Sequence, residues 1–145
     1  MSFAEPAVDR DVLGQPSADD YRWQKWSLPA DAPSVPFFRR WLRTILDDTV
    51  LDSDQVQDLL LAVGEAVSNA IEHAWKPTRP CVDMTVEVEH GRVTIVVQDF
   101  GAWRPGPTGA HRGRGLAMLS ALADTTVSCA RSGTTVTIRG PAPRR

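Results

Sequence analysis

The residues best suited to chemistry recur on one long stretch of helical periodicity. Glu65, Asn69 and His73 stand four positions apart, so at about 1.5 Å rise per residue they would line one face of a helix, about 6 Å apart. A carboxylate can accept a proton, and an amide oxygen can coordinate Mg²⁺ when substrate phosphates supply further ligands. Ala62 and Ala66 lie beside this row and would leave room for a flat molecule. A solvent-exposed polar strip is the competing interpretation.

A second candidate site follows an expected strand. Residues 93–97 lead directly into Asp99-Phe100-Gly101. A carboxylate at a strand end can accept a hydrogen bond from an exocyclic amine such as adenine N6, and the glycine lets a ring approach closely. A simple turn is the alternative, because Asp and Gly are common turn residues.

The same tripeptide holds magnesium in eukaryotic-type protein kinases. In those enzymes a His-Arg-Asp catalytic loop precedes it. Here the nearest counterpart is His111-Arg112-Gly113, which follows the tripeptide and lacks the aspartate. A chain of 145 residues is also too short for that fold, so the sequence excludes a eukaryotic-type kinase.

A third candidate lies at the start of an expected helix. Gly113 and Gly115 alternate with Arg112 and Arg114, and Leu116 follows. Glycines at a helix N-terminus let backbone N–H groups approach phosphates, and the helix dipole favours anions there. A third glycine and a preceding strand are both missing, so this is not the dinucleotide-binding fingerprint.

Hydrophobic periodicity indicates which elements must position these candidates. The expected elements are a strand at 21–28 with its aromatic side packed inward, helices at 37–48 and 52–75, a hairpin of strands 82–89 and 92–98 around His90-Gly91, a loop at 100–113, a helix at 116–122, and a hairpin of strands 125–130 and 134–139 around Ser132-Gly133. This order predicts an α+β fold: a two-layer α/β sandwich with a mixed, mainly antiparallel sheet and helices on one face.

Composition bounds the organisation and the partners. We expect one domain at 21–140, a flexible arm at 1–20 and a short tail at 141–145. The net charge of −2 offers no broad basic face to nucleic acid or anionic lipid, and no apolar run approaches the roughly 20 residues that span a bilayer. The N-terminus lacks a secretory signal pattern. These features predict a cytoplasmic protein with no direct nucleic-acid or membrane partner.

Cysteine usage adds one expectation. Cys81 and Cys129 stand alone in expected strands, which predicts two reduced, buried thiols. No Cys/His spacing suits a metal site.

The three candidates gain meaning from their order. Glu-x-x-x-Asn-x-x-x-His-Ala at 65–74, Asp-x-Gly at 99–101 and Gly-x-Gly-Leu at 113–116, with Gly-Thr-Thr at 133–135, resemble the N, G1 and G2 boxes of the GHKL, or Bergerat-fold, ATPases. The resemblance covers about residues 21–140. The stretches LLLAVGEAVSNAIEHAW, HRGRGLAMLSALAD and GTTVTI are most similar to the anti-sigma factor serine/threonine-protein kinases.

The resemblance implies roles for individual residues. Asp99 would bind adenine N6 beside Gly101, with Thr135 near the same edge. Asn69 would hold Mg²⁺, and Glu65 would take the proton from a serine hydroxyl of a partner protein.

The phosphate side of the site follows from the same resemblance. Gly113 and Gly115, with Arg112 or Arg114 and with Leu116 at the helix start, would cradle the phosphates. His73 would contact a phosphate or close its helix end.

The implied function is an ATP- (or ADP-) and Mg²⁺-binding anti-sigma factor. It would phosphorylate a serine of an anti-anti-sigma antagonist and exchange that antagonist for a sigma factor. Two alternatives stay open, a nucleotide-gated binder without phosphoryl transfer and a detached histidine-kinase catalytic domain.

A homodimer is also expected, through the first strand and helix. Five aromatic residues there exceed what a small sheet needs for its core. They are Trp23, Trp26, Phe37, Phe38 and Trp41.

Overall fold

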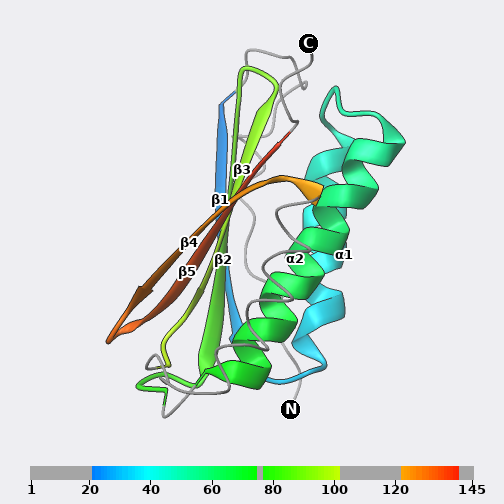
Figure 1. The fold of residues 1–145 in the computed structure, drawn as a ribbon. Coiled ribbons are helices and arrows are strands. Elements are labelled where there is room, and N and C mark those ends of the chain that lie inside the picture. The colour runs from blue at the N-terminus through cyan, green and yellow to red at the C-terminus, as the bar shows by residue number, and fades with distance from the viewer. Residues whose placement is uncertain (1–20, 75–76, 102–121, 141–145) are drawn as a thin grey trace.

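One layer of the protein is a sheet of five strands, and two helices cover one of its faces (Figure 1). The computed structural model describes residues 21–74, 77–101 and 122–140. Its elements are β1 (Arg22–Pro29), α1 (Ser34–Asp47), α2 (Ser53–His73), β2 (Cys81–Glu89), β3 (Arg92–Asp99), β4 (Asp124–Ala130) and β5 (Gly133–Gly140). The expected α+β sandwich with helices on one face is confirmed.

The strand order is β1-β2-β3-β5-β4, and every pairing among the described strands is antiparallel. The sequence predicted a mixed sheet, and no parallel pair occurs in the described part of the chain. Connectivity explains the difference. A single helix after β1 would return the chain to the end where β1 began and favour a parallel neighbour. Two successive helices bring it back to the end where β1 finished, so β2 pairs antiparallel.

The turn between β2 and β3 forms as the sequence predicts. His90 has φ of 51° and Gly91 has φ of 74°. Positive φ at both central residues is the signature of the type I′ turn, whose twist matches that of the flanking strands. This turn sets the register that ends β3 at Asp99.

The long helix α2 begins with a complete capping box. The Asp52 carboxylate accepts from the Gln55 backbone N–H at 2.8 Å, and the Gln55 side chain accepts from the Asp52 N–H at 3.0 Å. Both groups satisfy N–H donors that a helix start leaves unpaired. The helix then runs unbroken for 21 residues, so the polar row of Glu65, Asn69 and His73 lies on one rigid element.

The apolar side of α2 is wider than a single stripe, because α2 packs against both the sheet and α1. Its buried residues are Val56, Leu59, Leu60, Ala62, Val63, Ala66, Val67 and Ala70. Ala62 and Ala66 therefore belong to the hydrophobic core. The expectation that they leave room beside the polar row was wrong.

Strand β1 divides its aromatic residues between two faces. Trp26 is buried, whereas Trp23 is 50% exposed, because residues three positions apart in a strand point to opposite sides of the sheet. The expectation of one inward aromatic side was therefore wrong. Trp26 stacks on Trp41 of α1 with ring centroids 5.6 Å apart, and Phe37 and Phe38 contact the same indole.

A buried arginine at the start of β1 contacts the end of α1. Arg22 is 5% exposed, and its guanidinium donates to the backbone carbonyl of Asp48 at 3.3 Å. Its charge also lies 3.8 Å from the Asp48 carboxylate. Asp48 is the C-cap of α1, where unpaired carbonyls and the helix dipole favour a cation. Arg22 thus joins the edge strand to the end of α1.

Several predictions concern residues outside this core. Cys81 is half-buried and Cys129 is exposed, both as free thiols, so the expected burial is wrong for Cys129.

None of the described helices is long and apolar enough to cross a membrane. The predicted arm at 1–20, the tail at 141–145 and all but the last residue of the helix at 116–122 lie outside the described residues.

Candidate functional site

The polar row on α2 is partly exposed, as a binding surface requires. Glu65, Asn69 and His73 are each half-buried. Within the described residues, the side chains of Glu65 and Asn69 make no hydrogen bond or ion pair. A half-buried carboxylate and amide without protein partners leave their oxygen atoms to solvent or to a ligand. The row can therefore serve the base and metal-ligand chemistry expected of it.

His73 differs from the other two members of the row. It is the last residue of α2, and its Nε2 atom lies 3.7 Å from the carboxylate of Glu72. A histidine in the last turn suits the negative end of the helix dipole when it is protonated. This contact is with the preceding residue, and the role of His73 stays a prediction.

Asp99 is the most constrained acidic residue of the site. It is 3% exposed, and its Oδ1 atom accepts the backbone N–H groups of Gly101 and Thr134, each at 3.1 Å. Hydrogen bonds of this kind compensate for the burial of a carboxylate. They also tie the turn after β3 to the start of β5.

Gly133 makes this connection possible by close approach. Its φ is 149°, and a Cβ atom at this position would lie 2.0 Å from the carbonyl oxygen of Asp99. No side chain fits there, because real Cβ contacts of that length do not occur. The glycine of the Gly-Thr-Thr motif thus brings the β5 backbone against Asp99.

The structure brings Thr134 to Asp99, and not Thr135. Thr134 is 6% exposed and faces the helix layer together with Val136 and Ile138. Thr135 pairs with Gln98 on the opposite face of the sheet, because side chains alternate along a strand. Counting by two from the apolar residues of β5 would have identified Thr134 from the sequence.

A second group of contacts surrounds Phe100, and sequence reasoning missed it. The carbonyl oxygen of Phe100 accepts from the Thr78 backbone N–H at 2.9 Å and from the Thr78 hydroxyl at 3.3 Å. The guanidinium carbon of Arg79 lies 4.6 Å from the centroid of the Phe100 ring. These residues are about 20 positions apart in the chain, and no local pattern pairs them.

The polar row on α2 and the Asp99 carboxylate form the two halves of the site, and both lie toward one end of the molecule. Asp99 faces the helix layer at the end of β3, and α2 packs against β3 and β5. Figure 1 shows that α2 and β3 both finish at the same end of the sheet. The helix that carries Glu65 and Asn69 therefore ends near the strand that carries Asp99.

The predicted phosphate-binding group cannot be placed in this geometry. Arg112, Gly113, Arg114, Gly115 and Leu116 lie outside the described residues, and their roles stay predictions.

The described residues bear on the expected metal in one further way. They bring no three His, Cys, Asp or Glu side chains together, so no dedicated carboxylate or imidazole cage forms among them. Mg²⁺ often keeps few protein ligands and binds largely through substrate phosphates and water. The amide oxygen of Asn69 fits that mode of binding.

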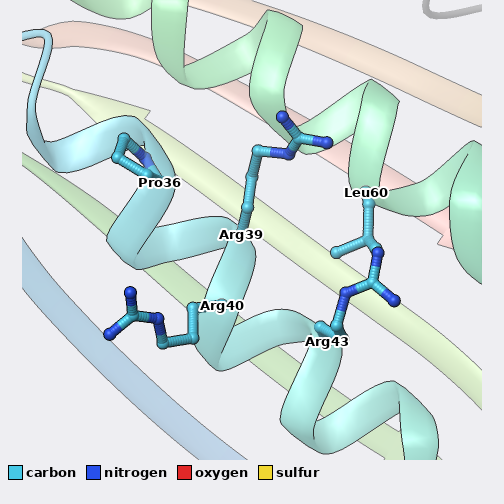
Figure 2. A pocket seen from close by; sticks show the side chains of 5 residues that line it. All are labelled: Pro36, Arg39, Arg40, Arg43 and Leu60. Carbon is cyan, nitrogen blue, oxygen red and sulfur yellow. The ribbon is translucent and has the colours of Figure 1, made fainter.

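A separate basic surface lies between the two helices (Figure 2). A shallow pocket of about 350 Å³ is lined by Pro36, Arg39, Arg40, Arg43 and Leu60. Arg39 and Arg43 extend toward α2, whereas Arg40 points away from it. The chain as a whole carries a net charge of −2, so this cluster is a local concentration of positive charge.

Comparison with known proteins decides the family. A model of the histidine kinase-like ATPase domain matches residues 28–139, which include α2, Asp99 and the Gly-Thr-Thr motif. The chain belongs to the histidine kinase-like ATPase domain family. The resemblance inferred from the N, G1 and G2 boxes is therefore confirmed at the level of family and fold.

Individual relatives add detail. The chain is 33% identical over 76 residues to serine-protein kinase RsbW of Staphylococcus epidermidis, which is 51% of this chain and 48% of that protein. The corresponding protein of Staphylococcus aureus strain Newman is 30% identical over the same length. The chain thus spans about half the length of the curated relatives it matches. The crystal structure of the RsbU and RsbW domains of Rv1364c from Mycobacterium tuberculosis superposes with a TM-score of 0.67 at 26% identity, over 81% of this chain and 32% of that one.

The close approach at Gly133 generates a stability prediction. Gly133→Ala places a methyl group against the Asp99 backbone, so it should cost more than the roughly 1–2 kcal/mol expected from positive φ alone. Gly91→Ala is the matched control. Gly91 has φ of 74°, but a Cβ atom there would meet only the Cγ2 methyl of Val50, at 3.6 Å. Urea unfolding of both variants measures the difference. Equal losses would contradict the requirement for glycine beside Asp99.

Proposed function

We propose that this protein is an ATP-dependent anti-sigma factor that phosphorylates a serine of an anti-anti-sigma antagonist in the cytoplasm. The observation that carries the proposal is the buried Asp99 carboxylate, held by two backbone N–H groups at the end of β3. The membership of the chain in the histidine kinase-like ATPase domain family and its similarity to RsbW proteins support the same function.

Nucleotide recognition would centre on Asp99. The exocyclic amine of adenine donates to this carboxylate, whose position is already fixed before the base arrives. Thr134 shares the same face and replaces Thr135 as the threonine beside the base. Gly101 leaves the approach to the ring open.

Phosphoryl transfer would take place along α2. The Oγ atom of the antagonist serine attacks the γ-phosphorus, its proton passes to the Glu65 carboxylate, and the bond to the ADP oxygen breaks. Mg²⁺ neutralises phosphate charge when bound, and the Asn69 amide oxygen would hold it. We assign the remaining phosphate contacts to Gly113, Gly115, Leu116 and the arginines Arg112 and Arg114, as the family resemblance implies.

Phosphorylation would then exchange the partners. A phosphoserine carries about −1.5 to −2 charge and would stand beside the phosphates of the nucleotide. Like charges repel there, so the phosphorylated antagonist leaves and the protein holds its sigma factor. A coupling of about 2–3 kcal/mol shifts such an exchange roughly 30- to 150-fold.

The basic surface on α1 is a candidate docking site for these protein partners. Arg39 and Arg43 form no ion pair with a described residue, and a groove with two unpaired guanidinium groups fits an acidic segment. The stem of Arg39 lies next to Gly64 on α2, since a Cβ there would lie 3.5 Å from its Cδ atom. We assign this surface to an acidic segment of the antagonist or sigma factor.

The open face of the sheet is a candidate dimer interface. Four of the five aromatic residues first assigned to an interface pack in or against the core, and only Trp23 stays largely exposed. The exposed aromatic surface therefore lies on the face that carries Trp23 and Tyr21. Both described helices lie on the other side (Figure 1). Five strands of about eight residues present roughly 600 Å², close to the ~800 Å² per partner of a stable interface.

One buried atom on that face supports a partner of complementary chemistry. Asp83 is 4% exposed, and its Oδ1 atom has no hydrogen-bond partner in the part of the chain that the structure describes. Its other oxygen lies 3.5 Å from the Lys25 ammonium. An unsatisfied buried carboxylate oxygen is costly, and the Asp83 side chain would relieve that cost if it turned outward to a donor of a second copy. We therefore propose that the protein dimerises through this face.

Substitutions at Glu65 and Asp99 test the proposed phosphotransfer. Glu65→Gln should keep ATP binding and lose about 10²-fold or more in turnover, because only the proton acceptor is removed. Asp99→Asn should instead weaken ATP binding, since the amide presents donors to the adenine amine. Calorimetry gives the affinities, and transfer of labelled phosphate to candidate anti-anti-sigma proteins gives the rates.

The nature of the product separates the alternatives. Phosphoserine on the antagonist supports the proposal, and acid-labile phosphohistidine would support a detached histidine-kinase domain. Nucleotide binding without transfer would support the non-enzymatic binder. Full turnover by the Glu65→Gln variant would remove Glu65 as the base.

The docking prediction concerns charge. Arg39→Glu should weaken binding of an acidic antagonist about tenfold or more, because a favourable charge pair becomes repulsive. Arg131→Glu is the control, since Arg131 is exposed in the turn between β4 and β5, outside this surface and outside the sheet face proposed for the dimer. Surface-plasmon measurements at low and high salt would show the effect and its screening. Equal losses from both variants would indicate a general charge effect and exclude this docking site.

The dimer prediction concerns the open face. Light scattering at micromolar concentration should return twice the chain mass of 15.9 kDa. Trp23→Glu should shift the dimer dissociation constant by about tenfold or more, because it places a charge in the interface. Leu61→Glu on α2 is the matched control, at 43% exposed against 50% for Trp23. A monomeric wild-type protein, or equal behaviour of the two variants, would contradict this interface.

A further inference from the structure

The turn that carries Asp99 is held from a second direction, by the short segment between α2 and β2. Thr78 donates both its backbone N–H and its hydroxyl to the carbonyl oxygen of Phe100, at 2.9 and 3.3 Å. The Arg79 guanidinium carbon lies 4.6 Å from the centroid of the Phe100 ring, within the range of a cation–π interaction. Phe100 is thus held at its carbonyl group and at its ring.

We propose that Thr78 and Arg79 are positioning residues for the nucleotide site, and that they act through Phe100 on the Asp99 carboxylate. The nucleotide part of this inference rests on the proposed function. The mechanical part rests only on the contacts.

Phe100 stands between the two groups whose relative position defines the turn. Asp99 supplies the carboxylate, and Gly101 donates its N–H to that carboxylate at 3.1 Å. Peptide units are rigid and planar, so a rotation of Phe100 carries the carbonyl of Asp99 and the N–H of Gly101 with it. Contacts that fix Phe100 therefore fix the geometry of the carboxylate.

The supporting segment is itself anchored. The carbonyl of Pro80 accepts the backbone N–H of Ala30 at 2.9 Å, which ties the segment to the connection between β1 and α1. The other end of the segment follows α2, which finishes at His73. Thr78 and Arg79 therefore link the helix with the polar row to the strand end with Asp99.

The pairing of Arg79 with an aromatic ring is the specific part of this support. Both side chains lie toward the surface, and Arg79 makes no ion pair with any described residue. The ring face of Phe100 is then the partner that orders the guanidinium. An exposed pair of this kind has a modest strength, which corresponds to about a two- to fivefold effect on an equilibrium.

Two measurements on the full chain test the proposal. In the nucleotide-free protein, Arg79→Ala should raise the hydrogen-exchange rates of the Gly101 and Thr134 amides about two- to fivefold, with the Ile95 amide in the middle of β3 as an unaffected reference. In calorimetry, the same variant should weaken ATP binding by a similar factor. Phe100→Leu should match it, because leucine keeps an apolar side chain but lacks the π face.

Conservative variants and a double variant separate positioning from general stability. Arg79→Lys keeps the charge and Phe100→Tyr keeps the ring, so both should stay near the wild-type values. The Arg79→Ala/Phe100→Leu double variant should be no worse than either single variant, because both remove the same contact. Uniformly faster exchange that includes Ile95 would indicate a merely structural role and would overturn the proposal.

The outcomes also separate this inference from the proposed function. Unchanged exchange at Gly101 and Thr134, together with additive single and double variants, would overturn the positioning role whether or not ATP binds. If the amides respond as expected but the wild-type protein binds no ATP, the proposed function fails and the support of Asp99 by Thr78 and Arg79 stands.

Discussion

The burial of one carboxylate constrains the site end of this fold. Asp99 is almost fully buried, and a buried charge needs hydrogen-bond donors close by. Two backbone N–H groups of described residues donate to it, one from Gly101 within the turn and one from Thr134 on β5. Because both bind one oxygen atom, the end of β3 and the start of β5 cannot move independently.

Several local features follow from that constraint. The N–H of Thr134 reaches the carboxylate only if β5 starts very close to β3, and Gly133 permits this because a side chain would overlap the Asp99 carbonyl. The tight turn at His90-Gly91 sets where β3 ends. Capping and core packing keep α2 straight across β3 and β5, so the polar row finishes beside the same strand end.

The sequence predicted the parts of this arrangement that depend on local periodicity. The helical spacing of Glu65, Asn69 and His73, the hairpin at His90-Gly91 and Asp99 at a strand end all follow from patterns within about ten residues. The fold class follows from the order of such patterns, and the family model confirms it.

Features that depend on which face is covered were harder to predict. Trp23 was expected on the inward side because an alternating strand gives two sets of side chains without saying which one the helices cover. For the same reason the sequence alone did not show that Thr134, and not Thr135, faces the helix layer with Asp99. Ala62 and Ala66 were misassigned because the width of the buried face of α2 depends on α1, a tertiary contact. Thr78 and its hold on Phe100 could not be predicted, since no period relates residues 22 positions apart.

The two faces of the sheet have different physical demands, and this division keeps the proposed binding sites apart. The helix-covered face holds the buried carboxylate, where rigid backbone donors position a charge. The other face carries Asp83, whose buried oxygen has no donor among the described residues. The basic surface at Arg39 and Arg43 lies on neither face, between the two helices. A nucleotide, a second copy and an acidic partner could therefore bind at once without competing for the same atoms. Coupling between them would run through the elements that the sites share: β2 and β3 pair directly between Asp83 and Asp99, and α2 packs against the sheet on one side and against α1 on the other.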